Sequence, residues 1–279
     1  MNDAVMPVLD ALLAAVLAAA GGYVGREFSR VKGRHWVAGF VAPFAVIMMV
    51  TVARRFSWLS YEPAFSWLMR GRREFFILGA AVAMMFMTLV PRLTSKRSKV
   101  LVTALMAVAV LNLSVAPFAL PVAVRTYLLG LDTQVDAEGV CLQNTGYTCG
   151  PAAAVTALRA LGVAAGEGQV AVAAQTTPIW GTELDILGAA CEELYGGDGV
   201  TCELTAYRDA GELAGRAAVV PIKHAFLVDH YVCVLDVGED GVTVGDPLQG
   251  KRMYSRGEFE ELWRHAALVF KRSGEGDTR

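Results

Sequence analysis

Three long runs without any charged residue constrain the fold of this chain more than any other feature. They are Trp36–Ala53, Phe75–Pro91 and Val100–Val124. A helix needs about 17–25 predominantly apolar residues to cross the hydrocarbon of a bilayer, and each run is long enough. A fourth run, Val8–Val24, is weaker because it contains Asp10 and the pair Gly21-Gly22. We therefore predict a bundle of about four transmembrane helices within residues 1–125.

Charge divides the chain into two dissimilar parts. Residues 1–131 carry 14 Lys and Arg against 5 Asp and Glu, a net charge of +9, whereas residues 132–279 carry 11 against 22, a net charge of −11. A basic apolar part joined to an acidic mixed part indicates two regions in two solvents. Because phosphate contacts need basic surface, the acidic part argues against nucleic acid as a partner.

The basic residues of the loops predict an orientation in the membrane. With four spans, the first and third loops share one side and carry eight Lys and Arg, against five in the second loop and Arg125 after the last span. The positive-inside rule then places both termini outside the cytoplasm. We expect a multi-pass protein of the cell membrane whose C-terminal part is extracytoplasmic.

Two local features of the membrane region suggest departures from simple spans. The second loop, Arg54–Glu74, carries the aromatic residues Trp58, Tyr61, Phe65 and Trp67. It is either an aromatic-anchored segment at the interface or a plain loop. Pro117 and Pro121 predict a kink or an early exit in the last span. The spans contain no ladder of acidic residues or histidines typical of a proton path, so we interpret them as an anchor.

Residues 126–139 are polar and acidic, and we predict that they form a linker before a globular domain at 140–279. Helices are expected from Pro151 to Leu161, from an N-cap at Thr182 to about Tyr195, and from the capping box Ser255–Glu258 to about Trp263. Strands are expected at Ala217–Ile222, Ala225–Val237, Val242–Gly245 and Ala267–Phe270. Helices followed by an antiparallel sheet predict an α+β domain.

Cys149 is the first candidate for chemistry. It precedes Gly150-Pro151 and therefore lies at the start of a predicted helix, where unsatisfied N–H groups and the helix dipole favour a thiolate. Gly150 has no side chain to block approach to the sulfur. Taken alone, a cysteine before a helix also fits a small buried residue of the core.

Three further residues complete a possible catalytic set. His230 lies in a strand-like run, and Asp246 ends the next strand, so a hairpin brings them to similar levels. A carboxylate there fixes the tautomer of an imidazole and stabilises its cation. Gln143, six residues before Cys149, is a candidate donor to the oxygen that becomes negative on attack. Alone, His230 also fits a core histidine and Asp246 a turn.

The order and spacing of these residues resemble the C39 family of bacteriocin-processing peptidases, which has a papain-like fold. In that family a Gln, a Cys-Gly pair, a His on a strand and an Asp-Pro pair follow one another, with separations similar to those here. The resemblance covers about Val140 to Phe270. It implies that Cys149 is the nucleophile, His230 the general base, Asp246 the orienting acid and Gln143 the oxyanion donor, with no cofactor and no metal.

The resemblance implies a membrane-anchored thiol protease that cleaves peptide precursors, with leader peptides of the Gly-Gly type among the family's substrates. The expected partners are a peptide or protein substrate, the lipid bilayer and a separate transporter or membrane complex. Family members often have Asp before the cysteine, where this chain has Thr148, and no G-x-x-x-x-G-K-[ST] run occurs in the sequence. The alternatives are a non-catalytic peptide-binding module and another acyl-transfer enzyme that uses Cys, His and Asp.

Other residues are weaker candidates. His224, six residues before His230, either lines the same site or caps a turn. Asp229 precedes His230 and should point to the opposite face of the strand, so it is a poor orienting partner. Cys191 and Cys202 flank a glycine-rich turn and form a disulfide if the domain is exported, or remain reduced packing residues.

Overall fold

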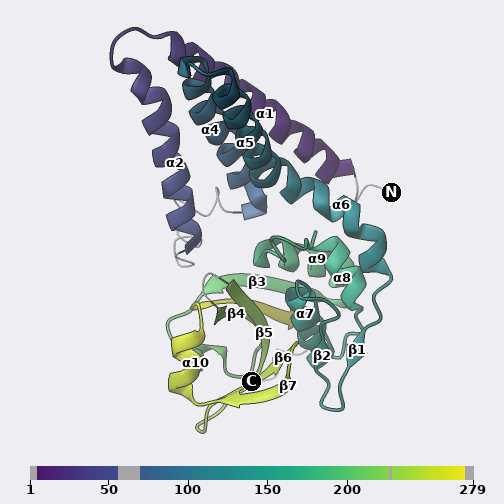
Figure 1. Cartoon of the computed structure of the whole chain (residues 1–279). Helices are drawn as coiled ribbons and strands as arrows, with labels where there is room; N and C mark the ends of the chain where they lie inside the picture. Colours follow the sequence, from purple (N-terminus) through teal and green to yellow (C-terminus); the bar gives the residue numbers. More distant parts are fainter. Residues whose placement is uncertain (1–4, 56–69, 226–227, 274–279) are drawn as a thin grey trace. The chain divides into compact units, whose positions relative to one another are not determined.

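The computed structural model describes residues 5–55, 70–225 and 228–273 (Figure 1). These residues fall into two compact units, Met1–Ala123 and Val124–Arg279. The aromatic residues of the predicted interfacial segment, Trp58, Tyr61, Phe65 and Trp67, lie outside the described residues.

The first unit is helical. Its elements are α1 (Val5–Arg30), η1 (His35–Val37), α2 (Ala38–Arg55), η3 (Arg70–Arg72), α4 (Arg73–Leu89), η4 (Val90–Arg92), α5 (Lys96–Val110), η5 (Leu111–Val115) and α6 (Ala116–Leu129). Among the residues that the structure describes, four helices are long and apolar enough to cross a membrane: Met6–Arg30, His35–Ala53, Arg73–Arg92 and Lys96–Leu129. The prediction of four apolar helices is confirmed, including the weaker first one.

Close packing between α1 and α4 explains the glycines of the first helix. A side chain at Gly21 would place its Cβ 2.2 Å from the carbonyl oxygen of Ala80, and one at Gly25 would lie 2.2 Å from that of Met84. Small residues four apart let two helix backbones touch, which is how helices associate where the surroundings are as apolar as the side chains. The glycines therefore allow α1 to pack closely against α4. In the sequence, the pair Gly21-Gly22 only made the first apolar run look weaker.

The last span is irregular where its prolines lie. The π-helical turn η5 precedes α6, and α6 continues past Pro121 to Leu129, so the prolines do not end the helix. Pro121 has no N–H group, and the carbonyl of Pro117 therefore lacks its helical donor. The Arg72 guanidinium donates to that carbonyl instead, with a distance of 2.6 Å from Nη1 to the oxygen.

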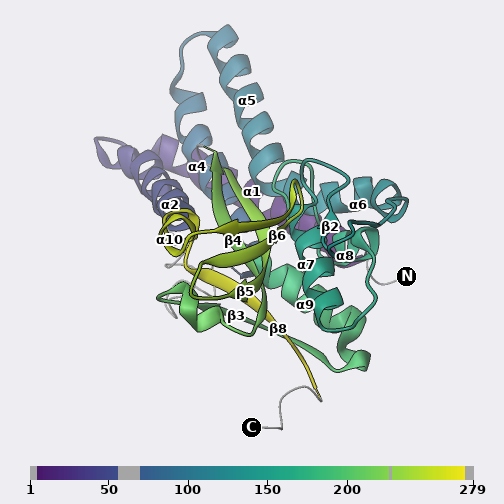
Figure 2. The same ribbon diagram turned by 90° about the horizontal axis from the view of Figure 1, so that it is seen from below.

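The second unit is an α+β domain built on an antiparallel sheet (Figures 1 and 2). Its helices are α7 (Cys149–Ala160), α8 (Glu167–Ala173), α9 (Leu184–Tyr195) and α10 (Arg256–Leu262), with η6 (Gly196–Asp198) and η7 (Ala210–Leu213). The main sheet contains β3 (Val200–Ala206), β4 (Ala217–Ala225), β5 (Val228–Val237), β6 (Val242–Asp246), β7 (Gly250–Tyr254) and β8 (Ala266–Arg272), in the order β3-β8-β4-β5-β6-β7. A small sheet pairs β1 (Gln134–Val135) with β2 (Cys141–Leu142).

Two apolar clusters cover the two faces of the main sheet. One joins α7, α8 and α9 to residues such as Val219, Cys233 and Leu268, and the other joins α10 and η7 to residues such as Val220, Val232 and Val269. From Gly150 to Leu158 every residue of α7 is buried, which the Ala-rich sequence permits because small side chains let the helix lie close to the sheet.

The expected α+β class is confirmed, with differences in detail. The capping box Ser255–Glu258 is present at the start of α10. The N-cap of α9 is Glu183 and not Thr182, whose hydroxyl bonds to the Thr176 hydroxyl at 2.8 Å between the oxygens and so is not turned to the helix. The sequence analysis did not predict β3, β7 or α8.

The segment 126–139, expected as a linker, packs within the second unit. Its first residues continue α6, where Leu128 is fully buried, and it also supplies β1. Gly168, the second residue of α8, lies so close that an added Cβ would stand 2.2 Å from the Leu128 carbonyl oxygen. The end of the last apolar helix is therefore packed against α8.

We predict that Gly168→Ala destabilises the second unit, because the Leu128 carbonyl belongs to the backbone and cannot move aside cheaply. The expected loss is about 1–3 kcal/mol of unfolding free energy, typical of overpacking. Tryptophan fluorescence of the full chain during denaturation in detergent measures it. Gly257→Ala is the matched control: Gly257 is the second residue of α10 and has open space around it, so alanine should be neutral or stabilising. Equal stability of the two variants would contradict the prediction.

Candidate active site

Cys149 is the first residue of α7 and is half-buried. The preceding residue, Thr148, makes no side-chain cap to the helix, and Pro151 occupies the first turn, where a missing N–H costs nothing. The N–H groups of the first turn have no acceptor within the helix. The sulfur therefore lies at the positive end of a 12-residue helix dipole, an environment that favours negative charge.

His230 and Asp246 come from neighbouring antiparallel strands, β5 and β6, and are both buried, with 5% and 2% exposed. Nε2 of His230 lies 2.8 Å from Oδ1 of Asp246. The same carboxylate oxygen accepts the backbone N–H of Leu248 at 2.8 Å. The hairpin thus brings together two residues that are 16 apart in sequence.

Cys149 acts on the same ring, because side-chain hydrogen bonding and charge from Cys149 both raise the pKa of His230. Because Nε2 is engaged by Asp246, Nδ1 is the nitrogen left for the sulfur. The contacts form a continuous chain from Cys149 through the imidazole of His230 to Asp246. Sulfur, base and orienting carboxylate in this order constitute an arrangement that activates a nucleophile.

These contacts raise the pKa of His230 to about 9. Burial is the largest single effect and acts in the opposite direction, because it disfavours the charged ring. The hydrogen bonds to Asp246 and Cys149, together with the charges of both groups, favour the imidazolium and outweigh burial. The surroundings of the ring thus favour the imidazolium over the neutral imidazole.

The pKa of Asp246 is lowered from its ordinary value. Burial alone would raise it, but the hydrogen bonds from His230 and from the Leu248 N–H favour the carboxylate. The Arg252 guanidinium adds to this from β7, with Nη1 3.9 Å from Oδ2 of Asp246. Asp246 is thus ionised throughout the neutral range, as an orienting partner of an imidazolium must be.

Gln143 lies in the loop that leads to Cys149. Its side-chain Nε2 donates to the Thr145 carbonyl at 2.5 Å, and its buried Oε1 has no partner among the residues that the structure describes. Its backbone N–H donates to the carbonyl of Pro247 at 2.9 Å, which ties the loop to the residue after Asp246. A primary amide has two N–H groups, so one remains for a ligand.

A buried carboxylate holds this loop, and the sequence analysis missed it. Glu167, fully buried at the start of α8, accepts the backbone N–H of Asn144 at 3.0 Å and also the Asn144 side-chain amide. Asn144 Nδ2 further donates to the Asp132 carbonyl at 2.7 Å. The partners are 23 residues apart, and a lone Glu after a glycine gives no sign of such a role. Glu167 positions the residue next to Gln143.

Thr148, which stands where the resembled family often has Asp, is fully buried. Its hydroxyl oxygen lies 3.2 Å from the Thr145 backbone nitrogen, whose N–H it accepts, and 3.1 Å from the Thr145 hydroxyl. These bonds close the turn immediately before Cys149. The threonine thus supports the loop from within.

Two further elements lie beside the candidate site. A Cβ added to Gly150 would be 3.1 Å from Cβ of Thr182, so Thr182 lies beside the start of α7. Thr182 directly follows the loop that contains Trp180 and is closed by the Thr177–Gly181 bridge. His224, a weaker candidate from sequence, has its ring centroid 5.5 Å from that of His230 and is exposed on β4. Both therefore border the site.

The remaining candidates are not part of this chain of contacts. Asp229 pairs with Arg264, with Oδ1 2.7 Å from Nη2, as its position on the opposite face of the strand predicts. Cys191 and Cys202 are free thiols, and burial raises the pKa of both, for Cys202 to about 12. Within the described ranges, no three His, Cys, Asp or Glu side chains form a metal-binding group.

The sequence model of the peptidase C39 family matches residues 138–275. An uncharacterized protein of Methanothermobacter marburgensis is 30% identical over 135 residues, which are 48% of this chain and 89% of that protein. An uncharacterized protein of Methanothermobacter thermautotrophicus is 30% identical over 142 residues, 51% of this chain and 94% of that protein.

Two solved structures are also similar. One is a double glycine motif protease from an AMS/PCAT transporter in complex with the leader peptide, with a TM-score of 0.42 and 17% identity over 51% of this chain and 94% of that one. The other is the peptidase domain of Streptococcus ComA, a bi-functional ABC transporter involved in a quorum sensing pathway, with a TM-score of 0.42 and 18% identity over 47% and 96%.

The raised pKa of His230 predicts a pH dependence of stability. The folded state holds the His230 proton more tightly than the unfolded chain, in which the pKa is about 6.5. The resulting stabilisation is complete below that pH and is lost as the pH rises through about 9. Asp246→Asn removes the main partner of the imidazolium. The difference in unfolding free energy between wild type and this variant should therefore shrink as the pH rises from about 6.5 to about 9. Denaturant titrations at several pH values measure the difference, and a constant value would contradict the prediction.

Proposed function

The chain belongs to the peptidase C39 family through residues 138–275, and from this premise we propose that it is a membrane-anchored cysteine peptidase that cleaves peptide precursors. The observation that carries the proposal is the chain of contacts from Cys149 through His230 to Asp246. The Thr145–Thr148 bonds add support, because they hold the turn before the nucleophile without the family's usual Asp.

In the proposed reaction, Cys149 attacks as a thiolate, stabilised by the His230 imidazolium and by the start of α7. The sulfur forms a bond to the carbonyl carbon of the scissile peptide. The imidazolium then gives its proton to the leaving amine as the C–N bond breaks, and an acyl-enzyme remains. His230 next takes a proton from water, whose oxygen attacks the acyl carbon and releases the sulfur. Asp246 holds the ring throughout.

Negative charge develops on the carbonyl oxygen in both steps. We assign its stabilisation to the backbone N–H of Cys149 and to the free N–H of the Gln143 amide. The Glu167–Asn144 contact supports this role, because it fixes the backbone beside Gln143. The hydrogen bond from Gln143 to the Thr145 carbonyl restrains the amide further.

The family resemblance also suggests the substrate and the partner. Leader peptides that end in Gly-Gly are the proposed substrate class, and a separate transporter or membrane complex is the proposed partner. The loop around Trp180, which lies beside Gly150, is a suitable wall for the peptide.

We predict that Cys149→Ala and His230→Ala each abolish cleavage, and that Asp246→Asn lowers its rate about a hundredfold or more while the fold is kept. The full chain in detergent is incubated with synthetic peptides that contain Gly-Gly, and mass spectrometry identifies new termini. Asp229→Asn is the matched control, because this aspartate precedes His230 but pairs with Arg264. An Asp246→Asn variant as fast as wild type would remove Asp246 from the mechanism.

Thiol labelling separates the peptidase from a non-catalytic peptide-binding module. Iodoacetamide should modify Cys149 much faster than Cys191 or Cys233, because burial raises the pKa of these two thiols, for Cys233 to about 12. His230→Ala should slow the labelling of Cys149 and leave that of Cys191 and Cys233 unchanged. Slow and equal labelling of all three cysteines would favour the binding module.

The proposal places the peptidase domain outside the cytoplasm. Its support is the distribution of charge: the segments Arg26–Arg34 and Arg92–Lys99, which include the connections α1–α2 and α4–α5 and the adjoining helix ends, carry eight Lys and Arg, against five in the segment Arg54–Glu74 and Arg125.

A reporter fused after Arg279 tests this orientation. Alkaline phosphatase, which needs an oxidising compartment, should be active there, and a fluorescent protein that needs the cytoplasm should be dark. A fusion after Lys32, in the first loop, is the control and should give the opposite pair of signals. The same signals at both positions would contradict a four-span topology, and reversed signals would place the domain in the cytoplasm.

A further inference from the structure

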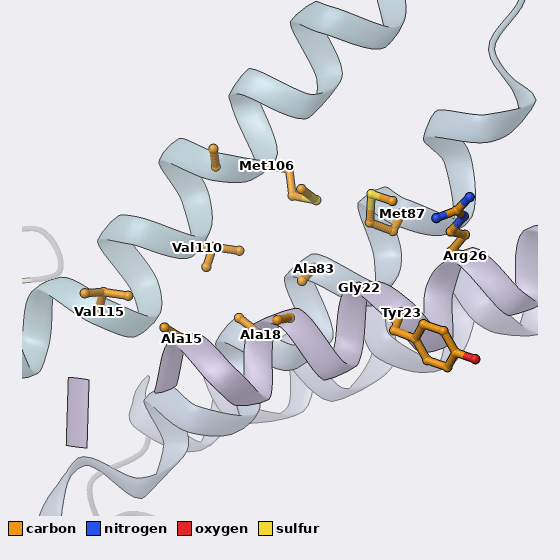
Figure 3. A pocket seen from close by; sticks show the side chains of 12 residues that line it. Ala15, Ala18, Gly22, Tyr23, Arg26, Ala83, Met87, Met106, Val110 and Val115 are labelled. Atoms are coloured by element: carbon orange, nitrogen blue, oxygen red, sulfur yellow. The ribbon is translucent and has the colours of Figure 1, made fainter. Parts of the chain in front are cut away.

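A cavity of about 450 Å³ lies between α1, α4 and α5 of the first unit (Figure 3). Its α1 wall consists mainly of small residues, among them Ala15, Ala19 and Gly22, and its other walls include Met87 and Met106. Such a lining is apolar and adaptable, because methionine is unbranched and flexible. The volume is within the range of ligand sites, about 300–1,000 Å³.

The ends of the cavity differ in chemistry. Ala15 and Val115 lie at one end, and Tyr23, Met87 and Arg26 at the other (Figure 3). Arg26 is the sole charged residue of the lining, and no acidic side chain is part of it. The cavity is therefore lined by apolar residues and has the cationic side chain of Arg26 at one end.

The length of the cavity corresponds to one leaflet of a bilayer. From Ala15 to Arg26 the helix rises about 17 Å, at about 1.5 Å per residue. Half of the hydrocarbon thickness is about 15 Å. The first apolar helix extends over Met6–Arg30, so Ala15 is near its middle and Arg26 is near its end. In a bilayer whose midplane lies near Ala15, Arg26 would be at the depth of the lipid phosphates.

Further positive charge surrounds this end of the unit. Arg92, after α4, donates from Nη2 to the Val31 carbonyl at 3.0 Å, and its guanidinium lies 4.3 Å from the centre of the Trp36 ring. The ends of α1 and α4 are therefore adjacent. The basic residues of these two loops, in addition to Arg26, are Arg30, Lys32, Arg34, Arg92, Lys96, Arg97 and Lys99.

We propose that this cavity binds an anionic phospholipid, with one acyl chain along the small residues of α1 and the phosphate paired with Arg26. The inference rests on the proposed membrane anchoring, but it does not depend on peptidase activity. Charge complementarity at the Arg26 end selects a lipid over a purely apolar helix.

Photolabelling of the full chain tests the proposal. The chain is reconstituted in phosphatidylcholine vesicles with a minor fraction of phosphatidylglycerol that carries a diazirine at the end of one acyl chain. Label is expected on peptides that contain Ala15 or Val115, at the end of the cavity away from Arg26. Arg26→Gln should lower the labelling about fivefold, the effect of one basic residue near an anionic surface. Arg30→Gln is the control, because Arg30 pairs with Glu27 at 2.6 Å and is not part of the lining.

A second pair of variants tests whether the acyl chain occupies the cavity. Ala19→Phe fills the cavity and should remove the label, whereas Ala20→Phe, exposed and outside the lining, should leave it unchanged. Equal labelling of these two variants would overturn the proposal. Equal competition by unlabelled phosphatidylcholine and phosphatidylglycerol would overturn the anionic headgroup. A disulfide between two copies of an Ala19→Cys variant would show a second chain in the cavity instead.

Flotation of the same vesicles separates failure of this proposal from failure of the anchor. All variants should float with the lipid after extraction with alkaline carbonate. A chain that stays at the bottom of the gradient would refute the membrane anchoring itself.

Discussion

The hydrogen bond between His230 and Asp246 is the contact on which the candidate site depends. Both side chains are buried, so an imidazolium and a carboxylate have been taken out of water, and neither is tolerated there without the other. The pair fixes the ring so that its second nitrogen meets Cys149. It also requires that β5 and β6 keep their register, because a slip of one residue would turn Asp246 away. The geometry of the candidate site and the stability of the hairpin thus depend on the same pairing of β5 and β6.

The helix that carries Cys149 has to lie close to this pair, and its composition makes that possible. From Gly150 to Leu158 every residue of α7 is buried, and most are small. In α1 a similarly Ala-rich sequence belongs to a helix that exposes Leu12 and Val16. The same composition thus occurs in a buried helix of one unit and in a helix with exposed apolar side chains in the other. The context decides between them: α7 packs against a sheet, whereas α1 packs against α4 along Gly21 and Gly25.

Local signals in the sequence were sufficient for much of this architecture. The charge-free runs predicted the apolar helices, and the Ser255–Glu258 box predicted the start of α10, because length and capping act within a few residues. The hairpin spacing predicted that His230 and Asp246 approach each other. What the sequence did not predict is long-range: the Glu167–Asn144 contact joins residues 23 apart, and β3 pairs with β8, more than 60 residues later. Thr182 failed as an N-cap because a tertiary partner, Thr176, competes for its hydroxyl.

The charge asymmetry of the chain connects the anchor with the domain it carries. The last span begins at the basic end of the helical unit with Lys96, and the acidic residues follow its other end, after Leu129. Anionic headgroups would be attracted to the basic end and would repel residues 132–279, whose net charge is −11. In the proposed orientation these two effects act at opposite leaflets and do not conflict. A reversed chain would put the basic loops outside and the acidic domain against the cytoplasmic leaflet, where the surface potential is most negative, so both effects would oppose it.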